Sequence, residues 1–272
     1  MPTASEVFSV EVDDHVATLW LDSPERRNAM GPAFWADLPV LMGELSRDTD
    51  VRAVVVAAKG PHFTVGLDLK AMGGALGGSG SSQAARAARF YPEVTRLQAA
   101  ITSVEACAKP VIAAVHGYCI GGGVDLITAA DIRLCSADAT FSVRETKMAM
   151  VADLGSLQRL PRIVGSGHVA ELAYTGKDVG ADRAFQIGLV NDVLPDAEAL
   201  RKASLELAAE IAANSPLAVQ GTKHVLRAGD GRTVAEGLDY VGLYNTSFLQ
   251  SNDLTEALTA FMEKRPPTFT GE

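Results

Sequence analysis

Short, uninterrupted apolar runs recur along the chain, separated by segments with helical periodicity. The clearest are residues 51–58, which contain Val54, Val55 and Val56, and residues 111–115. Runs of this length that are apolar at nearly every position are typical of strands buried on both faces, as in parallel sheets covered by helices. The sequence therefore predicts an α/β fold with helices packed on sheets.

The other elements follow from periodicity and from chain breakers. We expect strands at 8–12, 16–21, 132–135, 140–143 and 189–193, and helices at 31–47, 86–107, 122–130, 157–163, 169–175 and 181–188. The Gly/Ser tract at 73–82 is expected to be a flexible surface loop. Helical patterns fill the chain from residue 197 onward. We therefore divide it into a mixed core, 1–195, and a helical region, 196–272.

Charge and composition exclude several classes of protein. The net charge of −9 argues against a nucleic-acid or acidic-membrane partner. No stretch approaches the roughly 20 apolar residues of a membrane span, and no signal peptide is visible. The cysteines, Cys107, Cys119 and Cys135, are odd in number and form no C-x-x-C pair, so neither a disulfide framework nor a metal site is expected. We expect a cytoplasmic protein.

Two glycine-containing loops follow the two clearest buried runs. One spans residues 60–69, and the other contains Gly121, Gly122 and Gly123. Loops at the carboxyl ends of strands are where open α/β sheets hold ligands. The second loop opens a helix, whose free N–H groups favour negative charge. One N–H group from each loop would suffice to bind an oxyanion. A tight turn that permits close packing explains a glycine triplet equally well.

Three acidic residues lie downstream of the glycine triplet, in apolar or small-residue surroundings: Asp125, Glu145 and Asp153. Burying a carboxylate is costly, so acids in such surroundings indicate proton transfer. Each also has a structural explanation. Asp125 and Asp153 are placed to cap helices, and Glu145 has Arg144 and Lys147 beside it for a surface ion pair. The combination with two glycine loops favours the catalytic interpretation.

Several segments together resemble the crotonase (enoyl-CoA hydratase/isomerase) superfamily. They are residues 120–125, the loop at 66–69 and residues 158–161, and the similarity extends from residue 8 to residue 265. Within the superfamily the chain is most similar to the dienoyl-CoA isomerases. The resemblance implies a crotonase-like spiral of repeated ββα units. It also implies C-terminal helices that build a homotrimer or a dimer of trimers.

The resemblance also assigns roles to site residues. It implies that the N–H groups of Leu67 and Gly122 form the oxyanion hole for an acyl-CoA thioester. Glu145 would be the base, Asp153 the acid, and Asp125 a third acid supporting the pair. Hydratases of the superfamily typically carry Glu at the position of Asp125 and Gly at that of Asp153, so this chain departs from their pattern.

The function implied is isomerisation of a 3,5-dienoyl-CoA to a 2,4-dienoyl-CoA, with no cofactor beyond the CoA of the substrate and no metal. An enoyl-CoA hydratase that adds water to a 2-enoyl-CoA is the first alternative. A non-catalytic acyl-CoA-binding protein is the second.

Residues for the CoA part of the substrate are implied in the same way. The expected substrate-binding set is Arg26, Ala29, Gly66, Asp68, Leu69, Lys70, Gly121 and Lys264. The cations Arg26 and Lys70 lie near the first glycine loop in sequence, and Lys264 is expected to reach a CoA phosphate, in a neighbouring subunit if not in its own. Solvated surface charge is the alternative for each cation, because long charged side chains are mostly exposed.

Overall fold

A six-stranded sheet runs through the centre of the computed structural model, which describes residues 3–76 and 80–272. Its strand order is β1-β2-β3-β4-β6-β9. The bounds are β1 (Phe8–Asp13), β2 (Val16–Leu21), β3 (Ala53–Ala58), β4 (Val111–Val115), β6 (Ile132–Ser136) and β9 (Asp192–Leu194). Strand β1 pairs antiparallel with β2, and the other neighbours are parallel. The predicted α/β class is confirmed.

Both faces of this sheet are buried, as the apolar runs predicted. In β3, Ala53 and Val55 belong to an apolar cluster with the helix α8 (Ala197–Ala212), whereas Val54 and Val56 belong to the larger core on the opposite face. That larger core includes the buried side chains of α1 (Pro32–Arg47) and α3 (Gln83–Ala106). Alternate residues of one strand therefore stabilise two different layers.

A second sheet has three strands in the order β5-β7-β8, and two of its strands lead into segments that form the candidate active site. It is formed by β5 (Tyr118–Ile120), β7 (Thr140–Ser142) and β8 (Val179–Gly180). The chain passes from β4 through β5 into α4 (Gly122–Thr128), and from β6 through β7 and the 3₁₀ turn η2 (Glu145–Met148) into α5 (Ser156–Ile163). These are repeated ββα units, as expected. The helices α6 (Ser166–Thr175) and α7 (Ala181–Gln186) follow.

Two expected elements differ from the structure. The strand expected at 189–193 begins later, as β9 at Asp192–Leu194, because the N–H of Leu189 donates back to the carbonyl of Ala184 in α7 at 2.8 Å. The loop expected at 73–82 is wrong for 73–76, which belong to α2 (Leu69–Leu76). Asp68 stabilises the start of α2, since its Oδ1 accepts from the backbone N–H groups of Lys70 and Ala71. Residues 77–79 of the tract lie outside the described residues.

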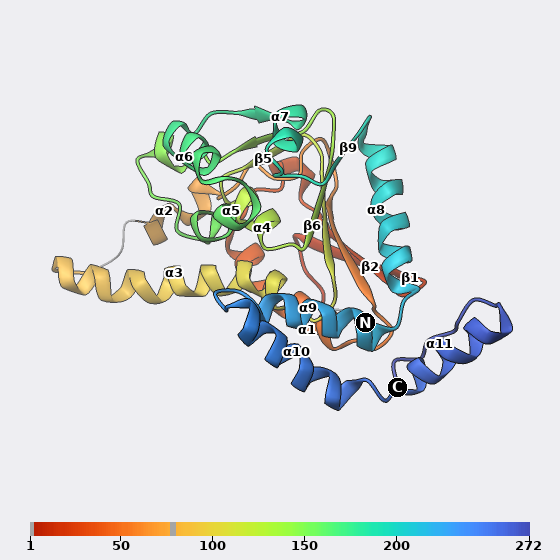
Figure 1. Cartoon of the computed structure of the whole chain (residues 1–272). Coiled ribbons are helices and arrows are strands. Elements are labelled where there is room, and N and C mark those ends of the chain that lie inside the picture. Colours follow the sequence, from red (N-terminus) through yellow and green to blue (C-terminus); the bar gives the residue numbers. More distant parts are fainter. Residues whose placement is uncertain (1–2, 77–79) are drawn as a thin grey trace.

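Three helices end the chain, and the last two of them extend away from the sheets (Figure 1). They are α9 (Pro216–Ala228), α10 (Val234–Phe248) and α11 (Asn252–Glu263). Large apolar side chains on α10 and α11 are exposed: Leu238, Leu243, Leu258, Phe261 and Met262. An apolar surface of this kind is typical of an interface with another protein. Within the ranges that the structure describes, no helix combines the length and apolar character required to cross a bilayer.

Candidate active site

The two glycine loops lie side by side and are joined by backbone hydrogen bonds. The N–H of Thr64 donates to the carbonyl of Tyr118 at 2.9 Å, and the N–H of Ile120 donates to the carbonyl of Thr64 at 3.1 Å. The Thr64 hydroxyl donates to the Asn28 carbonyl at 2.6 Å and accepts from the N–H of Gly66 at 3.1 Å. The structure therefore brings together two loops that are more than 50 residues apart in the chain.

Glycine is required where these loops touch. Gly66 has φ +85°, and a Cβ built there would lie 2.6 Å from the carbonyl oxygen of Ile120. A Cβ on Gly123 would lie 2.6 Å from Cγ2 of Thr64. Both distances are shorter than van der Waals contact allows. The close packing that a glycine triplet permits is thus present, and it is also what brings the two loop backbones together.

The N–H groups of Leu67 and Gly122 remain available for a ligand. Met30 bonds to the residues on either side of Leu67: its N–H donates to the carbonyl of Gly66 at 2.8 Å, and its carbonyl accepts from Asp68 at 3.1 Å. In such a parallel bridge the N–H of the middle residue points to the other side. Gly122 is the first residue of α4, where an N–H has no acceptor within the helix. Both residues line one cavity.

This cavity, called the acyl pocket below, has a volume of about 460 Å³. Its apolar wall includes Leu67, Met72, Phe90, Val94, Leu97 and Leu154. The same cavity is lined by Asp125, Glu145 and Asp153. The three acids, from α4, from η2 and from the segment before α5, are therefore brought together beside the two loop amides.

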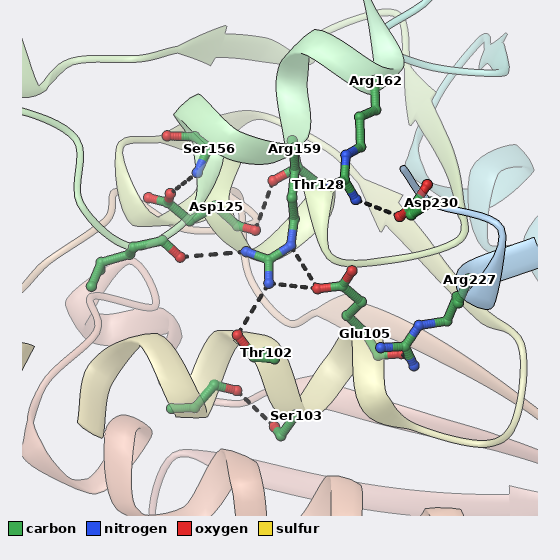
Figure 2. A network of polar contacts seen from close by, with 12 residues as sticks. Thr102, Ser103, Glu105, Asp125, Thr128, Ser156, Arg159, Arg162, Arg227 and Asp230 are labelled. Atoms are coloured by element: carbon green, nitrogen blue, oxygen red, sulfur yellow. Dashed lines mark hydrogen bonds and ion pairs between the residues drawn. The ribbon is translucent and has the colours of Figure 1, made fainter. Parts of the chain in front are cut away.

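Asp125 is almost completely enclosed. Its side chain is 1% exposed, and its Oδ1 accepts a hydrogen bond of 2.6 Å from the N–H of Ser156 (Figure 2). Burial raises the pKa of Asp125 to about 6, against the opposing effect of the Ser156 bond. The capping alternative is thus partly right, because Asp125 caps the first N–H of α5 rather than its own helix.

Glu145 is partly buried but keeps an unused hydrogen-bond acceptor. Its Oε2 is buried and has no hydrogen-bond partner among the described residues. The surface ion pair with Arg144 does not form, since Arg144 pairs with Asp178. Burial raises the pKa of Glu145 to about 7, and the negative charges of Asp125 and Asp153 add to the rise. Such a carboxyl is poised to exchange a proton near neutral pH.

Asp153 differs from the expectation that all three acids lie in apolar surroundings. It lines the acyl pocket but is solvent-exposed as a residue, because the segment before α5 passes along the rim of the cavity. Partial burial of the carboxyl raises the pKa of Asp153. Asp153 does not cap α5, since the N-cap of that helix is Gly155 and its first N–H is bound by Asp125.

The raised pKa of Glu145 has a consequence for stability. Its folded-state pKa of about 7 exceeds the ordinary 4.5, so the folded protein binds more protons than the unfolded chain between these values. The contribution to stability is present below pH 4.5 and is lost as the pH rises through 7. We expect Glu145→Gln to raise the free energy of unfolding by about 1–3 kcal/mol at pH 8. Urea unfolding at pH 8 and pH 5 checks this, and equal differences at both pH values would contradict it.

Sequence reasoning assigned no role to the side chains that fix the segment carrying Asp153. The Arg159 guanidinium donates to Glu105 Oε2 at 2.6 and 2.9 Å and to Thr102 Oγ1 at 3.1 Å (Figure 2). The Gln98 amide donates to the carbonyl of Asp153 at 2.7 Å. Helix α3 thus holds this segment through side chains more than 45 residues away in sequence, a distance at which no local pattern reveals the pairing.

Arg159 also affects Asp125, because its positive charge lowers the pKa of that carboxyl. We expect Arg159→Met to lower kcat by up to about 100-fold, since small displacements of catalytic groups are costly. The acid limb of the pH profile should move to higher pH, and KM should change little. The control is Arg183→Met, which removes a 45% exposed arginine side chain from α7. Equal losses in both variants, without a pH shift, would show that only folding was affected.

Only some of the residues expected to bind CoA lie close together in the structure. Ala29 adjoins Met30, which is bridged to Leu67, and Gly66 and Gly121 lie in the two joined loops. Arg26 is partly exposed, and its Nε donates to the Ser23 hydroxyl at 3.0 Å. Leu69 and Lys70 are exposed at the start of α2, and Asp68 is used as its cap.

Asn28, which is outside the expected set, and Lys264, which belongs to it, need separate description. Asn28 anchors the turn that carries Arg26, since its side chain is buried and donates to the carbonyls of Lys59 and His62. Lys264 directly follows α11, which lies on the opposite side of the molecule from α2 and α5 (Figure 1). A single chain therefore does not bring Lys264 to the pocket.

The fold and the site together indicate the family to which the protein belongs. The enoyl-CoA hydratase/isomerase family model matches residues 11–272. The chain belongs to the enoyl-CoA hydratase/isomerase family, as the crotonase resemblance indicated.

Individual relatives narrow the comparison. The chain is 46% identical over 255 residues to the mitochondrial Delta(3,5)-Delta(2,4)-dienoyl-CoA isomerase of Dictyostelium discoideum, covering 93% of this chain and 87% of that protein. It is 42% identical over 266 residues to the peroxisomal Delta(3,5)-Delta(2,4)-dienoyl-CoA isomerase of Arabidopsis thaliana, covering 97% and 96%. The solved enoyl-CoA hydratase of Bacillus anthracis has a TM-score of 0.89 at 30% identity, covering 98% of this chain and 100% of that one.

Proposed function

We propose that this protein converts 3,5-dienoyl-CoA to 2,4-dienoyl-CoA by acid/base proton transfer. The observation that carries the proposal is the presence of Asp153 with Glu145 and Asp125 in one pocket beside two free loop amides. The relatives named dienoyl-CoA isomerases support it. The reaction as proposed uses no metal and no cofactor other than the CoA of the substrate.

The chemistry starts at the thioester. The N–H groups of Leu67 and Gly122 bind the carbonyl oxygen and stabilise the enolate that forms when C2 loses a proton, which in comparable sites is worth roughly 3 kcal/mol per donor. Glu145 takes the proton from C2. The charge spreads along the conjugated diene to C6, where Asp153 delivers a proton. The double bonds move from C3 and C5 to C2 and C4.

This scheme needs one ionised and one neutral acid at the same time. The raised pKa values of Glu145, about 7, and Asp125, about 6, place proton exchange of the cluster near neutral pH. Like charges in one cavity oppose full ionisation, so a proton lost by one carboxyl is retained more tightly by the next. The titration belongs to the cluster as a whole.

The hydratase alternative uses the same scaffold, and the similar fold of the Bacillus anthracis enoyl-CoA hydratase favours keeping it in the test. Hydration would use Glu145 with Asp125 assisting and would not need Asp153. The test is a spectrophotometric comparison of 3,5-dienoyl-CoA and 2-enoyl-CoA as substrates for the purified protein. Faster turnover of the 2-enoyl-CoA would reject the isomerase. Tight binding without turnover of either would indicate an acyl-CoA-binding protein.

We also propose that residues 196–272 form the oligomerisation region of a homotrimer or a dimer of trimers. The exposed apolar side chains of α10 and α11, among them Leu258 and Phe261, support this. A neighbouring subunit would then be the one whose pocket Lys264 reaches. Light scattering coupled to size exclusion should give a multiple of three chains, and Phe261→Asp should reduce it. A monomer at micromolar concentration would contradict the proposal.

A cytoplasmic location remains part of the proposal. The three cysteines are free and buried in this structure, which suits a reducing compartment. The names of the relatives place those proteins in mitochondria and peroxisomes. Fractionation of cells that produce the protein, followed by immunoblotting, distinguishes these locations.

A further inference from the structure

Asp153 lies between two cavities. On one side is the acyl pocket. On the other is a second cavity, here called the polar cleft, of about 470 Å³, whose lining includes Gln98, Thr102, Glu105, Gln158, Arg159 and Arg162. The acyl pocket is mostly apolar, whereas these six side chains of the polar cleft are all polar or charged. A cleft with such a lining holds water in preference to an acyl chain.

Of these two cavities, the other two acids line only the acyl pocket. Neither Asp125 nor Glu145 lines the polar cleft. Asp125 is 1% exposed, and Oε2 of Glu145 is buried. An acyl chain that fills the pocket therefore separates these two carboxyls from bulk water. Asp153, which is exposed and lines both cavities, keeps contact with water on its far side.

We propose that the polar cleft is the proton supply of Asp153, so that the hydrogen delivered to the substrate at C6 comes from solvent during turnover. The inference rests on the proposed isomerase function. It assigns a role to a cavity outside the acyl pocket, and it makes the three acids of the pocket unequal in their access to water.

After one turnover the enzyme can return to its starting protonation state in two ways. In each turnover the C2–H bond breaks, its electron pair enters the dienolate, and its proton stays on Glu145. A C6–H bond forms with the proton of Asp153. The enzyme is left with a protonated Glu145 and an ionised Asp153. Either Glu145 passes its proton directly to Asp153, or Asp153 takes one from water in the polar cleft and Glu145 releases its own to water after the product leaves. Both routes balance, but the hydrogen at C6 has a different origin.

The experiment follows that hydrogen. Purified protein turns over unlabelled 3,5-dienoyl-CoA many times in D₂O, and mass spectrometry with NMR locates deuterium in the product. We expect close to one deuterium at C6, while recovered substrate keeps protium at C2. Protium at C6 over many turnovers would show direct transfer from Glu145 and would overturn the inference while leaving the isomerase function intact. Absence of any conversion would instead overturn the proposed function, and this inference with it.

A variant tests the cleft itself. Gln158→Phe narrows the polar cleft from the exposed side of α5 and leaves the acyl pocket unchanged. We expect a lower kcat with KM unchanged, and less deuterium at C6. The matched control is Gln186→Phe, at an exposed position at the end of α7 that lines neither cavity. Full kcat and full deuterium content in Gln158→Phe would show that Asp153 is not supplied through this cleft.

Discussion

Glu145→Gln is expected to lower kcat for 3,5-dienoyl-CoA by about 10³-fold or more, in the range that general acid–base groups contribute. The amide keeps the shape of the side chain but cannot accept the proton from C2. A 10³-fold loss corresponds to about 4 kcal/mol of transition-state stabilisation. The measurement is the steady-state rate of formation of the conjugated product. KM should change little, because the loop amides that bind the thioester are untouched.

The matched control is Glu93→Gln. Glu93 also lines the acyl pocket, but its carboxylate is paired with Arg96 at 2.7 Å. This variant should keep most of the activity. If both variants lose activity equally, the loss reflects the charge or packing of the pocket and not a base at Glu145. The inactive Glu145→Gln protein should also be the more stable one at pH 8, because the buried carboxylate is gone, which separates lost chemistry from lost folding.

Asp153→Asn is expected to abolish diene isomerisation and to affect hydration of a 2-enoyl-CoA only slightly. Isomerisation needs a proton donor at C6, and the amide cannot supply one, so a loss of about 10²–10⁴-fold is expected. Any hydration on this scaffold would use Glu145 and Asp125, which the change leaves in place. The rates for both substrates are measured on one preparation. Their ratio shows whether Asp153 is needed for isomerisation and not for hydration.

Asp230→Asn is the control for this change. It neutralises an exposed carboxylate that pairs with Arg162, on the α5 side of the same region (Figure 2). It should leave both rates near those of the unchanged protein. A full isomerase rate in Asp153→Asn would remove this residue from the mechanism, and the donor at C6 would then have to be Asp125.

The layers of the fold could be predicted from the chain because they depend on local residue pattern. The continuous apolar run in β3 fills two layers at once, so every residue must be apolar, and the run alone predicts a buried strand. The error at 73–76 has a local cause as well. Two glycines disfavour a helix, but the cap formed by Asp68 and burial of Met72 stabilise one.

The sequence by itself determined which residues are the candidates for the chemistry: loop glycines that allow backbones to touch, and acids set among apolar neighbours. Only the tertiary structure decided how these acids differ. The N–H that binds Asp125 belongs to Ser156, and α3 holds the segment of Asp153 through Gln98. Solvent access depends on which distant segments pack around a side chain. Enclosure of Glu145 and exposure of Asp153 therefore follow from the packing of α3, α4 and α5, which the order of residues does not reveal.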